Sequence, residues 1–174
     1  MSPFLQVDSG LNVRRSRRAV PVAQGVCLNA AVKTRALGPS LKQAMQRLKT
    51  YLVEDSPVIR DSLVATLQDL TAVQVVGFAE DEATAVRWLL EPSSEVQLGI
   101  IDIVLKRGSG LGVLQALHGS GRGLKLVVLS NYVTPDIRRR CLDLGADQVF
   151  DKSGEIDALI GYCAGLAAAH AGDG

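Results

Sequence analysis

The chain has 174 residues and a formal net charge of +1, which is enough for one domain of ordinary size and a flanking segment. Apolar residues make up 47% of it, yet no apolar run approaches the roughly 18 residues of a membrane-spanning helix, so we expect no membrane span. The three cysteines, Cys27, Cys141 and Cys163, are odd in number and form no CxxC pair, which argues against a disulfide framework and favours a reduced, cytoplasmic setting.

Charge divides the chain into two parts. Residues 1–49 contain nine Lys/Arg and one acidic residue, a net of +8, whereas residues 50–174 contain ten Lys/Arg and seventeen acidic residues, a net of −7. We therefore expect a basic, disordered extension over residues 1–47, an acidic domain over residues 48–170 and a short tail over residues 171–174.

The arginines of the extension, in the run RRSRR at residues 14–18, leave its purpose open. Upstream sequence added by a misplaced start is one reading, with Met45 as the candidate true start. A paired-arginine export signal is another, although Pro21 and Gly25 interrupt the apolar stretch that follows. A contact with nucleic acid or a membrane through the arginines is the third.

From Lys49 onward, short apolar runs alternate with segments of helical apolar spacing. The runs predict five strands, in TYLV, VQVVGFA, VQLGII, LKLVVL and QVF. The segments between and after them predict helices over about residues 57–70, 81–90, 110–118, 135–144 and 155–169.

The first predicted helix has a clear start signal. Ser56 is a favourable cap, and Pro57 suits the first helical position. The apolar spacing predicts one largely buried face made of Val58, Ile59, Leu63, Leu67 and Leu70.

Five strand–helix units in succession predict an α/β fold with a parallel sheet covered by helices on both faces. Right-handed crossovers then favour a flavodoxin-like (βα)5 doubly wound sheet with strand order 2-1-3-4-5. Ligands of such sheets bind outside the carboxyl ends of the strands, at the switch point between the first and third strands. The functional site is expected there.

Polar residues stand where four of the five apolar runs end. Glu54 and Asp55 follow the first strand, Asp102 the third, Ser130 the fourth and Lys152 the fifth. Because the carboxyl ends of parallel strands share one edge, these side chains should meet in one shallow crevice.

Carboxylates gathered in this way repel one another unless a cation lies between them. Oxygen ligands with open positions suit Mg²⁺. Asp102, at the central strand, can then act as a nucleophile towards phosphorus. Lys152 would supply a cation and Ser130 a hydrogen-bond donor for the phosphoryl oxygens.

Four stretches of the domain resemble the receiver domains of two-component response regulators: LVEDSPVIRDSL, GIIDIVLKRGSGLGVLQAL, VVLSNY and LGADQVFDKS. The resemblance covers almost the whole domain. It implies that Asp102 is phosphorylated by a partner histidine kinase or phosphotransfer protein, and that Glu54 and Asp55 form the acidic pair that binds Mg²⁺.

The resemblance also assigns roles to residues around the acceptor. The backbone carbonyl of Val104 is implied as a further Mg²⁺ ligand, Ser130 as the switch hydroxyl and Lys152 as the lysine beside the phosphoryl group. Gly110 falls at the family's glycine eight residues past the acceptor.

The sequence departs from the family pattern at a few positions around the site. Ser153 stands where many members have a proline after a cis bond, and Lys106 replaces a common proline. The switch aromatic position holds Val149, which leaves Phe150 or Tyr132 as substitutes, and Asn131 is larger than the usual residue after the hydroxyl.

A single-domain signalling switch is the reading that these features favour. Only 22 residues follow Lys152, so we expect no DNA-binding or enzymatic output domain, and no turnover beyond hydrolysis of its own aspartyl phosphate. The expected partners are a sensor histidine kinase or phosphotransfer protein and an unknown downstream protein. A homodimer would use the face of the fourth helix, fifth strand and fifth helix.

Two alternatives stay open. One is a Mg²⁺-dependent phosphatase of the haloacid-dehalogenase type, whose motif needs a second aspartate two residues after the nucleophile, where this chain has Val104. The other is a phosphorylation-independent interaction module that keeps only the fold.

Overall fold

The computed structural model describes residues 47–172. The expected basic extension, with its arginine run and the candidate start at Met45, lies outside the described residues, apart from residue 47. Everything that follows concerns the described part of the chain.

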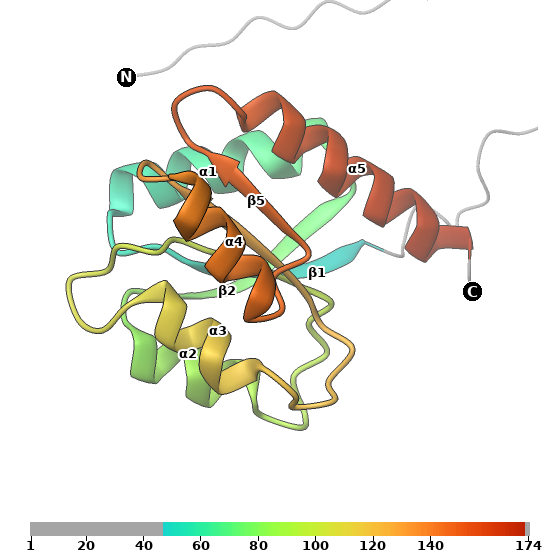
Figure 1. Cartoon of the computed structure of the whole chain (residues 1–174). Coiled ribbons are helices and arrows are strands. Elements are labelled where there is room, and N and C mark those ends of the chain that lie inside the picture. Colours follow the sequence, from blue (N-terminus) through green and yellow to red (C-terminus); the bar gives the residue numbers. More distant parts are fainter. Residues whose placement is uncertain (1–46, 173–174) are drawn as a thin grey trace, which may run out of the picture. The chain divides into compact units, whose positions relative to one another are not determined.

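Strands and helices alternate from the first described strand onward (Figure 1). The strands are β1 (Leu48–Val53), β2 (Val73–Ala79), β3 (Leu98–Ile101), β4 (Lys125–Ser130) and β5 (Gln148–Asp151). The helices are α1 (Pro57–Leu70), α2 (Glu82–Leu89), α3 (Gly110–Leu117), α4 (Pro135–Asp143) and α5 (Ile156–Gly172). These bounds agree with the predicted elements, except that α5 runs further than expected.

The strands form one parallel sheet in the order β2-β1-β3-β4-β5. The chain therefore runs outward to one edge of the sheet, returns past β1, and then builds the other half strand by strand. This is the flavodoxin-like topology that the sequence predicts, and the prediction is confirmed. The switch point lies between β1 and β3, where the helices that follow leave on opposite faces.

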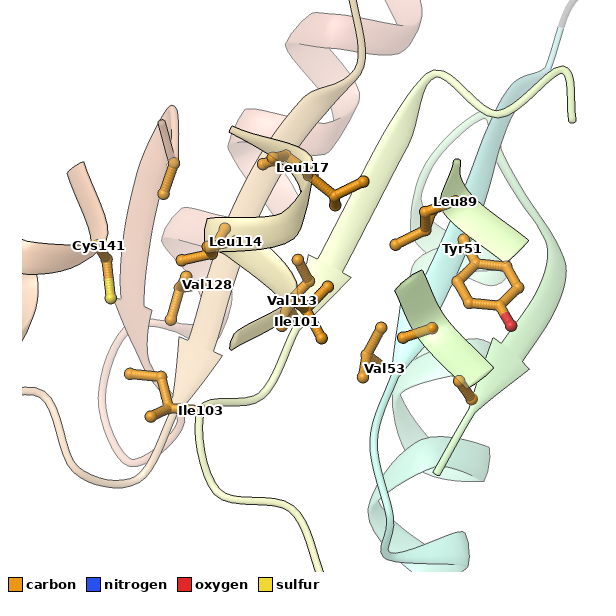
Figure 2. Close-up of a cluster of buried hydrophobic side chains, with 14 of the residues drawn as sticks. Tyr51, Val53, Leu89, Ile101, Ile103, Val113, Leu114, Leu117, Val128 and Cys141 are labelled. Atoms are coloured by element: carbon orange, nitrogen blue, oxygen red, sulfur yellow. The ribbon is translucent and has the colours of Figure 1, made fainter. Parts of the chain in front are cut away.

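Helices cover both faces of the sheet. On one face, α2, α3 and α4 enclose a core in which Val53, Ile101 and Val128 of neighbouring strands lie against Val113 and Leu114 of α3 (Figure 2). Figure 1 shows α1 and α5 together on the opposite side. Because successive strand residues point to opposite faces, this burial on both sides requires the nearly continuous apolar runs of the central strands.

The second core lies under α1 and α5. Leu52, Ile100 and Leu129 of the three central strands are at most 1% exposed and pack there with Leu67 and Leu159. Both described cysteines, Cys141 under α4 and Cys163 under α5, are buried free thiols. Burial raises the pKa of Cys163 to about 12, so this thiol behaves as a small apolar side chain.

Helix α1 begins and ends where predicted, but its predicted apolar face is partly wrong. Leu63 and Leu67 are buried, whereas Val58 is 78% exposed and Leu70 is 63% exposed. Val58 precedes Leu63 by five residues, which places it about 140° round the helix from the buried stripe. Leu70 lies on the stripe by angle but in the last turn, where the chain leaves for β2.

Ser56 is the N-cap residue of α1, yet its side chain makes no capping hydrogen bond. Its backbone N–H instead donates to Glu54 Oε1 over 3.1 Å. The start of α1 is thus tied to the acidic residue that follows β1 rather than closed by its own hydroxyl.

The two leucines of α1 offer a direct test of this core. We expect Leu67→Ala to lower the free energy of unfolding by about 2–5 kcal/mol, because it removes a fully buried side chain and leaves a cavity. Leu70→Ala, the same change on the exposed end of the helix, should cost about 0.5 kcal/mol or less. Urea denaturation followed by circular dichroism measures both, and similar losses for the two variants would contradict this arrangement.

Candidate functional site

A small pocket opens at the carboxyl ends of β1, β3, β4 and β5. Its volume is about 180 Å³. It is lined by all the strand-end residues that the sequence predicts to converge, with Val104 and other loop residues: Glu54, Asp55, Ser56, Ile59, Asp102, Val104, Ser130, Asn131, Tyr132 and Lys152. Parallel pairing brings these ends together, although the residues are up to 98 positions apart in the chain.

Lys152 lies between two of the carboxylates. Its Nζ donates to Glu54 Oε2 and to Asp102 Oδ2, each over 2.6 Å. The three side chains are at most 9% exposed. Burial on its own lowers the pKa of Lys152, but the hydrogen bonds that the ammonium donates to Asp102 and Glu54, together with their negative charges, outweigh it, so the net pKa is raised and the lysine stays charged.

The second oxygens of these carboxylates are held by backbone amides. Glu54 Oε1 accepts from the N–H of Ser56, and Asp102 Oδ1 accepts from the N–H of Val104 over 3.2 Å. Asp102 is therefore fixed from two sides at the end of β3, by an ammonium and by the loop that follows its own strand.

Asp55 faces the pocket from the loop after β1 and is bound by Lys106 of the β3–α3 loop. The backbone N–H of Lys106 donates to Asp55 Oδ2 over 3.0 Å, and its Nζ donates to the Asp55 backbone carbonyl over 3.1 Å. This contact could not be predicted from the sequence, because Lys106 stands 51 positions away in a loop of glycines and charged residues.

Ser130 ends β4 and is fully buried. Its Oγ has no hydrogen-bond partner among the described residues. Buried hydroxyls are nearly always paired in folded proteins, because an unpaired one has lost its contacts with water. An unpartnered hydroxyl on the wall of this pocket therefore points to a ligand atom that completes it.

A divalent cation needs several oxygen ligands around it. Within residues 47–172, no three or more His, Cys, Asp or Glu side chains are arranged to hold a metal ion as they stand. The donor set fits Mg²⁺ nonetheless: three carboxylates line the pocket against one buried ammonium, which leaves excess negative charge, and oxygen donors are those that Mg²⁺ prefers.

The model of the response regulator receiver domain family matches residues 50–163 of the chain. The chain belongs to this family. The resemblance expected from the sequence is thus confirmed, and the chain is a receiver domain of the two-component response regulators, whose general function is a phosphorylation switch.

Individual relatives agree with this family. A probable transcriptional regulatory protein of Picosynechococcus is 29% identical over 125 residues, which are 69% of this chain and 49% of that protein. The response regulator domain of Thermotoga maritima CheB superposes with a TM-score of 0.60 at 18% identity, covering 72% of this chain and 97% of that one.

A third relative carries a modified site. A Burkholderia pseudomallei response regulator, whose structure contains a phosphorylated aspartic acid, a calcium ion and citrate, superposes with a TM-score of 0.57 at 18% identity, covering 69% of this chain and 68% of that one. This receiver spans between 24% and 55% of the length of three curated relatives that it matches. Over residues 47–172, no helix combines the length and apolar character that crossing a bilayer requires.

The receiver's departures from the family pattern have visible consequences. The described residues contain no cis peptide bond, so Ser153 follows Lys152 through a trans bond. Val149 points to the α4 side of the sheet, and Phe150 points to the opposite side, where its ring lies 6.0 Å from that of Tyr162. Of the two expected substitutes for the switch aromatic, only Tyr132 is at the pocket, and it is 67% exposed.

Arg138 is the first of three consecutive arginines in α4, and its side chain is only partly exposed. Its guanidinium donates to the Val149 carbonyl and to Glu155 Oε2, the latter over 3.0 Å. Glu155 Oε2 also accepts from the N–H of residue 151 over 2.7 Å. Arg138 therefore links α4 to the loop that carries Lys152, and nothing local distinguishes it from its two arginine neighbours.

Gly110 lies so close to the backbone of Asp102 that an added side chain would force the backbone to move. A Cβ at this position would lie 2.1 Å from the backbone carbonyl oxygen of Asp102. The glycine N–H donates to the carbonyl of Ile103 over 2.9 Å, which holds the start of α3 against the end of β3. The family glycine is thus required by contact with the backbone of Asp102.

We expect Gly110→Ala to destabilise the fold by about 1–3 kcal/mol or more, because a rigid backbone atom must move to accept the methyl group. Gly161→Ala is the matched control: it lies within α5 with nothing within 4 Å of the added Cβ, and should stabilise by about 0.5–1 kcal/mol. Thermal or urea unfolding of both variants measures the difference. A neutral Gly110→Ala would contradict the close approach.

Proposed function

We propose that this receiver is a phosphorylation-dependent signalling switch in which Asp102 accepts a phosphoryl group from the phosphohistidine of a sensor kinase or phosphotransfer protein. In this proposal the receiver domain comprises residues 48–170, with residues 1–47 as an extension and 171–174 as a tail. One observation carries it: Asp102, the buried ammonium of Lys152 and the unpartnered hydroxyl of Ser130 line one pocket.

The transfer needs a nucleophile and groups that receive the new charge. A carboxylate oxygen of Asp102 forms a bond to phosphorus while the bond from phosphorus to the donor histidine nitrogen breaks, and that nitrogen keeps the electron pair. Lys152 offers N–H donors and a positive charge to the phosphoryl oxygens, and Ser130 offers an O–H donor.

Mg²⁺ is the cofactor that this proposal includes. Glu54, Asp55, Asp102 and the backbone carbonyl of Val104 would hold it. When bound, it neutralises charge that develops on the phosphoryl oxygens. The phosphorylated aspartic acid and calcium ion in the Burkholderia relative support a site of this kind.

The phosphoryl group adds negative charge to the pocket, about −1.5 to −2 by analogy with phosphorylated hydroxyl side chains. This added charge is what would change the binding of a downstream protein. We propose that this charge draws Ser130 and Lys152 towards the phosphoryl group. The equilibrium between two conformations of the face made by α4, β5 and α5 then shifts. Arg138 and Glu155 join these elements to the Lys152 loop. A downstream protein, or a second copy in a homodimer, would read this face in the cytoplasm.

The central prediction concerns Asp102. Acetyl phosphate with Mg²⁺ should add the mass of one phosphoryl group to the protein, and Asp102→Asn should abolish the addition, because the amide is not a nucleophile of this kind. Intact-mass spectrometry measures it. Asp143→Asn, the same change at an exposed residue of α4, is the control and should label normally.

The same preparations separate the alternatives. Repeated turnover of p-nitrophenyl phosphate with Mg²⁺ would favour a phosphatase over a switch, whose only turnover is hydrolysis of its own aspartyl phosphate. If neither Asp102 nor any other residue is labelled, and Asp102→Asn binds its partners as the wild type does, the interaction module is the better reading.

Ser130→Ala offers a second prediction. The hydroxyl makes no hydrogen bond among the described residues, so its removal should change the unfolding free energy of the unlabelled protein by only about 0.5 kcal/mol. It should, however, reduce the gain in melting temperature that acetyl phosphate and Mg²⁺ give the wild type. Ser130→Thr keeps the hydroxyl and should retain the gain; equal gains for Ser130→Ala and wild type would count against this role.

A further inference from the structure

Lys106 connects two loops at the rim of the pocket. Its Nζ lies 3.9 Å from Asp55 Oδ2 as well as donating to the Asp55 backbone carbonyl, while its backbone N–H holds the same Oδ2. The lysine side chain is 72% exposed, whereas that of Asp55 is 16% exposed. An exposed ammonium group therefore lies beside a mostly buried carboxylate of the pocket.

The charges of the pocket make this placement significant. Glu54 and Asp102 share the buried ammonium of Lys152, and Asp55 has no part in that group. Among the ion pairs within residues 47–172, Asp55 pairs with Lys106 alone. Asp55, the pocket carboxylate that does not bind Lys152, is therefore the one that pairs with the exposed Lys106.

We propose that Lys106 sets the affinity of the receiver for its divalent cation, by holding a competing positive charge on Asp55. This inference rests on the proposed function, in which Asp55 is one of the Mg²⁺ ligands. A cation bound at Asp55 meets the repulsion of the ammonium or displaces it towards solvent, and either outcome weakens binding. Lys106 thereby raises the Mg²⁺ concentration at which the site becomes competent for phosphoryl transfer.

The size of the effect follows from the exposure of the ammonium. Two unit charges about 4 Å apart in bulk water interact by an energy equivalent to roughly a fivefold change in an equilibrium constant. Added salt screens such an exposed charge strongly. The contribution of Lys106 should therefore be a few-fold at low ionic strength and should shrink at high ionic strength.

The test measures Mg²⁺ binding to the unphosphorylated protein by isothermal titration calorimetry. Lys106→Gln removes the charge and keeps the backbone N–H, and Lys106→Arg keeps both. Arg107→Gln is the matched control: Arg107 is the next residue, is 80% exposed, and pairs over 3.0 Å with Asp81 instead of a pocket residue. All variants change exposed side chains, and an unfolding curve for each checks that the fold is kept.

Lys106→Gln should bind Mg²⁺ roughly fivefold more tightly than wild type at low ionic strength, and the advantage should decline with added salt. Lys106→Arg and Arg107→Gln should bind like wild type. The Mg²⁺ concentration that half-saturates labelling by acetyl phosphate should fall in parallel. Equal affinities for Lys106→Gln and wild type, or an equal gain for Arg107→Gln, would overturn the inference.

The outcomes separate this inference from the function beneath it. A wild-type protein that binds Mg²⁺ and is labelled at Asp102, with no effect of Lys106→Gln, removes only the role of Lys106. A wild-type protein that neither binds Mg²⁺ nor is labelled removes the proposed function, and the inference with it.

Discussion

One buried ammonium lies between two buried carboxylates at the ends of three strands. Lys152, after β5, binds Glu54, after β1, and Asp102, after β3, and almost no water reaches the three charges. Burying charges costs several kcal/mol per ion, which their attraction repays only in good geometry. Two buried carboxylates on one lysine also leave an excess of negative charge. Such an arrangement is a poor means of stabilising a fold, and its position at the switch point of the sheet indicates a function.

The loop after β3 must hold Asp102 in register with that lysine, and it is fastened at three places. Gly110 lies against the backbone of Asp102 itself, and Lys106 joins the loop to Asp55. On the far side, the Glu82 carboxylate at the start of α2 accepts from the N–H of Ser109 over 2.7 Å. Helices α2 and α3 thus share a contact at their first turns, so the packing on one face of the sheet also positions the loop that follows Asp102.

The sequence predicted the fold and the strand-end residues of the pocket because both depend on patterns that can be recognised in the sequence alone. Apolar runs buried on both faces and helical spacing define the units, and parallel pairing then places every strand end at one edge. Where several residues of the same type could equally make a contact, the sequence did not indicate which of them does. Arg138 donates hydrogen bonds to β5 and to Glu155 while Arg139 beside it stays exposed, and Val58 is turned away from the core by its angle round α1. Those choices depend on the exact rotation of a helix against its neighbours.

Lys152 in the pocket and Lys106 at its rim differ chiefly in burial, and this separates what each can do. Lys152 is 7% exposed, so its attraction to Asp102 acts with little screening, and its net raised pKa keeps it charged. Lys106 is 72% exposed, so water and salt weaken its electrostatic interaction with Asp55. A buried cation fixes where the Asp102 carboxylate lies, whereas an exposed one could only adjust how tightly another cation binds beside it.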